Sequence, residues 1–250
     1  MKEEYENQNI YDNIEFFNGY KTIRENDNSA NNIEETPALF SLLPDLKNQT
    51  VLDLGCGYGD NCRVFSEKGA SYVTGIDISV RMLSVANAKN KLKNIEYLQM
   101  QMEDISDLAR CFDIITSSLA MHYIADYYEL VTNIFNILNP GGYFVFSQEH
   151  PLITSPKRGV QWATKNKQIE YYCLSNYTHE EKRDIFWIVD GVIKYHRPFS
   201  AIINPLIQVG FNILEILEPS VSIEIIEKIP DYIKNRHVPN FLLLKVQKPK

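Results

Sequence analysis

The sequence contains no long uninterrupted apolar run and no pair of closely spaced cysteines. Its longest uncharged stretches, residues 131–148 and 198–214, are broken by Asn, Pro and Gly, whereas a membrane span needs about 20 mainly apolar residues. The first four residues, Met-Lys-Glu-Glu, lack the apolar core of a secretory signal. We therefore expect a cytoplasmic protein with no membrane segment.

Cysteine is scarce, and its spacing excludes the usual zinc motifs. The four cysteines show no Cys-x-x-Cys pattern, so we expect free thiols in a reducing compartment and no metal site. An excess of basic side chains is also missing, because 25 Lys and Arg stand against 32 Asp and Glu, a formal net charge of −7. Nucleic-acid binding depends on neutralising many phosphates, so we expect no nucleic-acid partner.

The charge is unevenly distributed along the chain. Residues 1–149 carry 11 basic and 22 acidic side chains, and residues 150–250 carry 14 and 10. The basic balance of the second part could favour an anionic substrate, although a solvated Lys and Arg surface is the more ordinary explanation. Apolar residues make up 44% and charged residues 23% of the 250 residues, which is typical of a globular protein.

Short apolar runs alternate with helical patterns through most of the chain. The runs predict strands at residues 50–54, 72–76, 95–98, 112–116 and 143–146, with helices between them. A helix at residues 202–209 and strands at 211–217 and 241–246 follow near the C-terminus. This alternation predicts a parallel sheet covered by helices on both faces.

We expect a single domain over residues 1–250. N-terminal helices occupy residues 1–48, the core spans 49–150, and residues 201–250 complete the sheet. Residues 151–200 interrupt the alternation and form an inserted cap. A hairpin around Asp190-Gly191 is predicted in this cap, which is rich in aromatic residues: Trp162, Tyr171, Tyr172, Tyr177, Phe186, Trp187 and Tyr195.

A glycine turn directly follows the first predicted strand, in VLDLGCGYG at residues 51–59. Glycine lets the backbone turn sharply and lets a ligand lie against it, and the next helix presents free N–H groups there. Asp77 ends the next strand, where a ribose-binding carboxylate is expected. No Gly-Lys-Ser/Thr follows the turn, which excludes a nucleoside-triphosphate loop.

In combination these segments resemble the class I S-adenosylmethionine-dependent methyltransferases. VLDLGCGYG is similar to the first motif of the family, and GIDIS at residues 75–79 is similar to the second. FDIITSSLAMHY at 112–123 and LNPGGYFVF at 138–146 resemble the fourth strand and the turn into the fifth. Glu-His-Pro at 149–151 resembles a small bacterial subgroup without one agreed substrate. The resemblance covers about residues 48–149.

The resemblance implies a Rossmann-like α/β fold, with a seven-stranded sheet in which six strands are parallel and the last is antiparallel. It implies S-adenosylmethionine as cofactor and S-adenosylhomocysteine as product. The implied cofactor-binding residues are Tyr20, Asp53, Gly55, Cys56, Gly57, Asp77, Ile78, Met82, Met102, Glu103, Asp104, Ser118 and Leu119.

Several of these residues have a specific implied role. Gly55 and Gly57 would pass under the methionine moiety, and Asp77 would accept hydrogen bonds from the ribose hydroxyls. Asp104 would bind the adenine amino group or simply cap a helix. Ser118 would form, with its neighbour Leu119, the wall nearest the sulfonium. Tyr20 would close the site or pack in the core beside other aromatic residues.

The catalytic candidates are His122, Glu149 and His150, which follow the fourth and fifth predicted strands. Each could act as a base or position the acceptor, and each has a structural alternative in fixing a loop or the turn before Pro151. In-line displacement at the methyl group requires mainly alignment and exclusion of water, without a metal ion.

The predicted function is methyl transfer from S-adenosylmethionine to a small-molecule acceptor. The cap would cover the acceptor site and select an aromatic or carboxylated compound. The alternative is a protein that binds S-adenosylmethionine or S-adenosylhomocysteine as a sensor or scaffold. A nicotinamide dehydrogenase is disfavoured, because position 60 is Asp where the dinucleotide fingerprint has Gly or Ala. The cap aromatics could equally pack the cap or form a dimer interface, so a monomer or a homodimer is expected.

Overall fold

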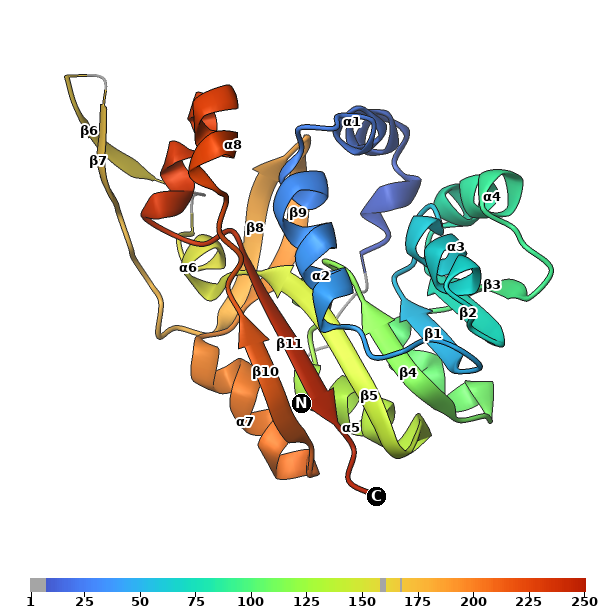
Figure 1. The fold of residues 1–250 in the computed structure, drawn as a ribbon. Coiled ribbons are helices and arrows are strands. Elements are labelled where there is room, and N and C mark those ends of the chain that lie inside the picture. Colours follow the sequence, from blue (N-terminus) through green and yellow to red (C-terminus); the bar gives the residue numbers. More distant parts are fainter. Residues whose placement is uncertain (1–7, 158–160, 167) are drawn as a thin grey trace.

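The computed structural model describes residues 8–157, 161–166 and 168–250, and its centre is a seven-stranded sheet in the order β10-β11-β5-β4-β1-β2-β3 (Figure 1). The strands are β1 (Thr50–Leu54), β2 (Tyr72–Asp77), β3 (Ile95–Gln99), β4 (Phe112–Ser117), β5 (Leu138–Glu149), β10 (Asn212–Leu217) and β11 (Phe241–Gln247). Six strands share one direction, and β11 is antiparallel to both of its neighbours. This arrangement confirms the predicted Rossmann-like fold.

Helices cover both faces of the sheet, as predicted. One face carries α2 (Thr36–Leu42), α3 (Asp60–Glu67) and α4 (Val80–Lys89), and the other carries η3 (Met102–Leu108), α5 (Tyr127–Ile137) and α7 (Phe199–Val209). The Ser79 hydroxyl begins α4 by accepting a hydrogen bond from the Met82 N–H at 3.1 Å. Gly210, with φ of 109°, ends α7 in the left-handed conformation that glycine tolerates.

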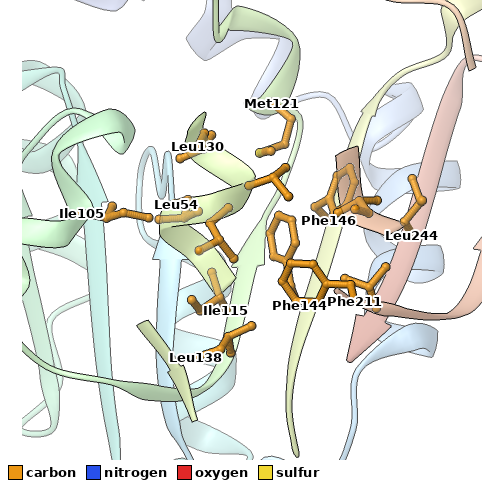
Figure 2. Close-up of a cluster of buried hydrophobic side chains, with 14 of the residues drawn as sticks. Leu54, Ile105, Ile115, Met121, Leu130, Leu138, Phe144, Phe146, Phe211 and Leu244 are labelled. Atoms are coloured by element: carbon orange, nitrogen blue, oxygen red, sulfur yellow. The ribbon is translucent and has the colours of Figure 1, made fainter. Parts of the chain in front are cut away.

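Strand residues alternate between the two apolar layers because successive side chains point to opposite faces. The larger cluster joins β5 and β11 to α5 and α7, with Phe144 and Phe146 stacked 4.6 Å apart between ring centres (Figure 2). Phe211 and Leu244 pack against the same layer. Val145, between the two phenylalanines, instead joins the cluster beneath α2.

The N-terminal segment packs against a hairpin of the cap. It contains η1 (Ile10–Asp12), α1 (Ile14–Arg24) and the π-helical turn η2 (Asn31–Glu35), and the hairpin consists of β8 (Glu181–Trp187) and β9 (Val189–His196). The ring of Phe16 in α1 meets that of Trp187 edge to face at 5.3 Å. This interlocking places α1 and the hairpin at the same end of the sheet (Figure 1).

The hairpin turns at Ile188 rather than at the predicted Asp190-Gly191. Ile188 has φ of 68°, an unusual conformation for a branched residue. It packs so closely on α1 that a β-carbon added to Gly19 would lie 2.4 Å from its Cγ2. We attribute the shift to this tertiary packing, which outweighs the local turn preference of Asp-Gly.

The remaining cap and C-terminal elements lie further from the sheet. The hairpin of β6 (Trp162–Lys165) and β7 (Gln168–Tyr172) projects away from the body, near α8 (Ile223–Lys228) (Figure 1). Trp162 meets His237 edge to face at 6.2 Å, just beyond η5 (Pro230–Arg236). The sequence pattern did not indicate α8 and η5. No helix in the described part of the chain is long and apolar enough to cross a membrane.

The stacked phenylalanines allow a test of the core. Phe146 is fully buried, and Phe146→Ala should lower the free energy of unfolding by about 3–5 kcal/mol because it leaves a cavity. Phe186, in β8, is 71% exposed, so Phe186→Ala should change the free energy of unfolding by less than about 0.5 kcal/mol. Urea denaturation of both variants measures the difference, and similar values for the two would contradict the described packing.

Candidate functional site

A cavity of about 510 Å³ opens at the carboxyl ends of the parallel strands. It lies where the strand order reverses between β1 and β4, the position at which open α/β sheets bind ligands. All predicted cofactor-binding residues except Asp104 line it: Tyr20, Asp53, Gly55, Cys56, Gly57, Asp77, Ile78, Met82, Met102, Glu103, Ser118 and Leu119.

The glycine turn and Asp77 meet because β1 and β2 are paired in parallel. The Gly57 N–H donates a 2.8 Å hydrogen bond to Oδ2 of Asp77, and the Ser79 N–H donates one of 2.8 Å to Oδ1. Burial raises the pKa of Asp77 to about 6. A carboxylate has about four lone-pair sites, so Asp77 can still accept hydrogen bonds from a ligand in the cavity.

Gly57 leaves room for a ligand directly against the backbone. It has φ of 54°, and a β-carbon added there would meet no described atom within 4 Å. Gly55 differs, because an added β-carbon would lie 2.7 Å from Cβ of Ala120. Gly57 therefore keeps the cavity open, whereas Gly55 is required by packing between the turn and the loop after β4.

Asp53 lies beneath the glycine turn and is held by side chains of neighbouring elements. The Thr116 hydroxyl donates a 2.8 Å hydrogen bond to its Oδ1, and the Cys62 thiol lies 3.4 Å from its Oδ2. Burial raises the pKa of Asp53 to about 7. This carboxyl group therefore both supports the turn and contributes a titratable group to the cavity.

The segment after β3 borders the cavity with two of its three predicted residues and with two further ones. Gln101, Met102 and Glu103 line it, together with Met100. Asp104 is exposed and lies outside the lining, because the tight turns of η3 direct neighbouring residues to different sides. Gln101 was not identified from the sequence, although its place at the end of a strand was a usable signal.

The N-terminal segment covers the cavity more extensively than predicted. Tyr20 lines it as expected, and Tyr11 and Arg24 line it as well. The Tyr20 ring lies 5.2 Å from that of Tyr11 and 6.1 Å from that of Tyr58, measured between ring centres. Arg24 forms an ion pair with Asp60 at 3.0 Å. Sequence spacing alone could not reveal these neighbours, because they meet only through the tertiary fold.

His122 and Glu149 meet at the end of the cavity nearest β5. Nδ1 of His122 accepts a 3.4 Å hydrogen bond from the Glu149 N–H, which leaves Nε2 as the N–H donor of the neutral ring. Burial lowers the pKa of His122 to about 3. Burial opposes ionisation of Glu149, but the Lys194 ammonium, with Nζ 2.5 Å from Oε1, brings its pKa below the usual value.

His150, a predicted catalytic candidate, does not line the cavity, and its contacts are structural. Its Nδ1 accepts a 3.2 Å hydrogen bond from the Leu152 N–H, which caps α6 (Pro151–Thr154). Its Nε2 lies 2.8 Å from the carboxylate of Glu218. The ring therefore fixes the chain after β5, which is the structural alternative named for it.

Of the aromatic residues predicted to shape the pocket from the cap, Trp187 alone lines the cavity. Tyr171 and Phe186 are exposed, and Trp162 belongs to the projecting hairpin. The cap also contributes Ile153 from α6. The cap therefore supplies one aromatic wall, and the rest of the aromatic surface comes from the N-terminal segment and from Tyr58, Tyr123 and Phe241.

The cavity fits S-adenosylmethionine chemically. Its volume is within the range of about 300–1,000 Å³ of small-molecule sites. It combines a buried carboxylate at Asp77, an open glycine backbone at Gly57 and apolar side chains at Met82 and Met102. The carboxylate suits the ribose hydroxyls, and the open glycine backbone suits the methionine chain. The apolar side chains suit the flat adenine base.

Comparison with known proteins agrees with this geometry. Residues 52–146 match a family model described as a methyltransferase domain. The crystal structure of an S-adenosylmethionine-dependent methyltransferase from Mesorhizobium loti has 34% sequence identity and a TM-score of 0.79, and the match covers 88% of this chain and 99% of that one.

Two curated relatives differ in how much of the chain they match. An uncharacterized protein of Haemophilus influenzae is 38% identical over 221 residues, 85% of this chain and 87% of the relative. A ubiquinone biosynthesis O-methyltransferase of Neisseria meningitidis is 33% identical over 107 residues, 41% of this chain and 45% of the relative. The chain therefore belongs to the S-adenosylmethionine-dependent methyltransferases, and it is an enzyme that transfers a methyl group from S-adenosylmethionine.

Proposed function

We propose that the methyl acceptor is a small molecule held between the N-terminal segment and the ends of β4 and β5. The observation that carries this proposal is the composition of the cavity on that side. Tyr11, Tyr123 and Trp187 supply aromatic walls, and His122 and Glu149 supply polar groups. A few polar groups in a largely apolar cleft are typical of a site that orients a small ligand.

We propose that the cofactor lies along the ends of β1, β2 and β3. Asp77 would bind the ribose hydroxyls, and the methionine moiety would lie on Gly57. The adenine ring would lie beside Met102, with polar contacts from Gln101 and Glu103 in place of Asp104. The bound cofactor supplies an electrophilic methyl group, and the protein positions it beside Ser118 and Leu119.

The acceptor side is built to orient its ligand and is poorly suited to remove a proton. The pKa of His122 is lowered to about 3, and its Nδ1 lone pair already accepts a hydrogen bond from the Glu149 N–H. Glu149 is held ionised by Lys194, so it is a weak base. We therefore propose that His122 donates to the acceptor and that Glu149 accepts from it, which favours nucleophiles that need no strong base.

The cap has a smaller proposed role than its composition indicated. Trp187 forms one wall, and Lys194 acts from behind Glu149. Acceptor selection is then shared between the N-terminal segment and the β8–β9 hairpin, which pack together through Phe16 and Trp187. Turnover screening of small amines, phenols and carboxylic acids tests this proposal, and transfer to a macromolecule alone would contradict it.

Asp77 and Asp104 form a matched pair for testing the cofactor site. Asp77→Ala should weaken S-adenosylmethionine binding by about 1.5–3 kcal/mol, roughly 10- to 150-fold, because it removes charge-assisted hydrogen bonds. Asp104→Ala should leave the affinity unchanged, since Asp104 lies outside the cavity. Calorimetry on both variants measures this. Equal losses in the two, or tighter binding of NADH than of S-adenosylmethionine, would contradict the assigned site.

Gly57 and Gly191 provide a second matched pair. Both have positive φ, of 54° and 79°, and a β-carbon added to either would meet no described atom within 4 Å. Gly57→Val should abolish cofactor binding because its side chain would fill the cavity. Gly191→Val introduces similar backbone strain outside the cavity and is the control for that strain. Calorimetry with circular dichroism as the folding control separates the effects. Retained binding in Gly57→Val would place the ligand elsewhere.

Lys194→Met removes the cation of the ion pair with Glu149, and the pH dependence of the variant's stability tests this pair. In the wild type the pKa of Glu149 is lower in the folded than in the unfolded state. The ion pair therefore stabilises the fold at pH values above the unfolded-state pKa of Glu149. This contribution is lost as the pH falls through the folded-state pKa. Without Lys194, burial dominates and raises that pKa, so the folded variant takes up a proton as pH falls. Denaturation should show a loss of roughly 2–3 kcal/mol at pH 7 and a smaller loss at pH 4.

Lys194→Arg, which keeps the charge, should retain most of the stability and serves as the control. A loss in Lys194→Met that is the same at both pH values would show that Lys194 acts through packing alone. Its ammonium lies 4.6 Å from the centre of the Trp187 ring, so some packing contribution is expected in any case.

A further inference from the structure

Glu35 is a fully buried carboxyl group that the proposed cofactor and acceptor contacts do not use. Its Oε1 accepts hydrogen bonds from the Ser118 hydroxyl at 2.8 Å and from the Ser147 hydroxyl. Its Oε2 accepts one from the Thr36 hydroxyl at 3.1 Å. Three hydroxyl groups from α2, β5 and the loop after β4 thus converge on one carboxylate.

Within the described ranges, no Lys, Arg or His forms an ion pair with Glu35. A buried charge without a counter-ion is costly, and a hydrogen-bond network compensates only part of this cost. The hydroxyl donors nevertheless favour the ionised form, because each donates toward the carboxylate oxygens. A nearby cation therefore stabilises the ionised form of Glu35, as the charge of Arg24 already does in part by lowering its pKa.

Ser118 connects this carboxylate to the cavity. The serine lines the cavity at the end of β4 and donates to Glu35, so Glu35 lies one hydrogen bond behind the wall. The proposed function places the cofactor's sulfur beside Ser118. That sulfur is positively charged in S-adenosylmethionine and neutral in S-adenosylhomocysteine.

We propose that Glu35 is a specificity-determining residue that favours the positively charged cofactor over its neutral product. The inference rests on the proposed position of the cofactor. During transfer the acceptor's lone pair forms the new bond to the methyl carbon, and the carbon–sulfur bond breaks with its electron pair remaining on sulfur. The sulfur loses its charge in this step, so the attraction to Glu35 ends and product exchange becomes easier.

The test compares the affinities for S-adenosylmethionine and S-adenosylhomocysteine by calorimetry at pH 8. Glu35→Gln should weaken binding of S-adenosylmethionine at least about fivefold and change that of S-adenosylhomocysteine less than about twofold, since the charge acts on the cation alone. Burial raises the pKa of Glu35, so a basic pH favours its ionised form.

Glu34→Gln is the matched control, because it removes a buried carboxyl group from the same turn. Oε1 of Glu34 accepts hydrogen bonds from the Nδ2 groups of Asn235 and Asn240, at 2.6 and 3.0 Å, and not from Ser118. Burial raises its pKa to about 7, so it too is mainly ionised at pH 8. The affinity ratio of the two ligands should stay within about twofold of the wild-type ratio in this variant.

The outcomes separate the inference from the proposed function. Equal weakening of both ligands in Glu35→Gln, or no change in either, overturns the role of Glu35 while leaving the cofactor site in place. Failure of wild type to bind either ligand overturns the cofactor site itself. If Glu35→Gln does not fold, Glu35→Met removes the charge without a buried amide, and the same affinity ratio decides.

Discussion

The parallel pairing of β1 with β2 and β4 brings three strand ends to one edge of the sheet. The hydrogen bond from the Gly57 N–H to Asp77 exists because the end of β2 lies beside the turn after β1. The same edge receives Ser118 from the loop after β4 and Glu149 from β5. Without this register the ligand-binding groups would be distributed along the chain with no common cavity.

Buried and half-buried carboxyl groups are the main electrostatic feature of this edge, and each is stabilised differently. Asp77 accepts backbone N–H groups, Glu149 has the Lys194 ammonium, and Glu35 has three hydroxyl donors. Burial raises the pKa of Asp77 and Glu35, whereas the cation brings that of Glu149 below its usual value. Proximity to a cation therefore decides which group remains an anion over the widest pH range.

Local sequence patterns predicted the core of the fold and the cofactor side of the cavity. The glycine turn and Asp77 were found because each directly follows or ends a strand. Arg24 and Lys194 were not, since α1 and β9 approach the cavity only through long-range packing. The resemblance implied Asp104 and did not identify Gln101, because sequence spacing does not specify which side of a tight turn faces a cavity.

The acceptor side combines groups whose chemistry follows from burial. An exposed histidine would titrate near neutral pH, but His122 is buried, and its lowered pKa keeps the ring neutral. Its Nδ1 is engaged by the Glu149 backbone, so the cavity receives a donor from His122 and an acceptor from the Glu149 carboxylate. Such a pair fixes the orientation of a group that both donates and accepts hydrogen bonds. In the proposed function, alignment of that group with the methyl donor, rather than removal of its proton, is therefore the contribution that we propose for His122 and Glu149.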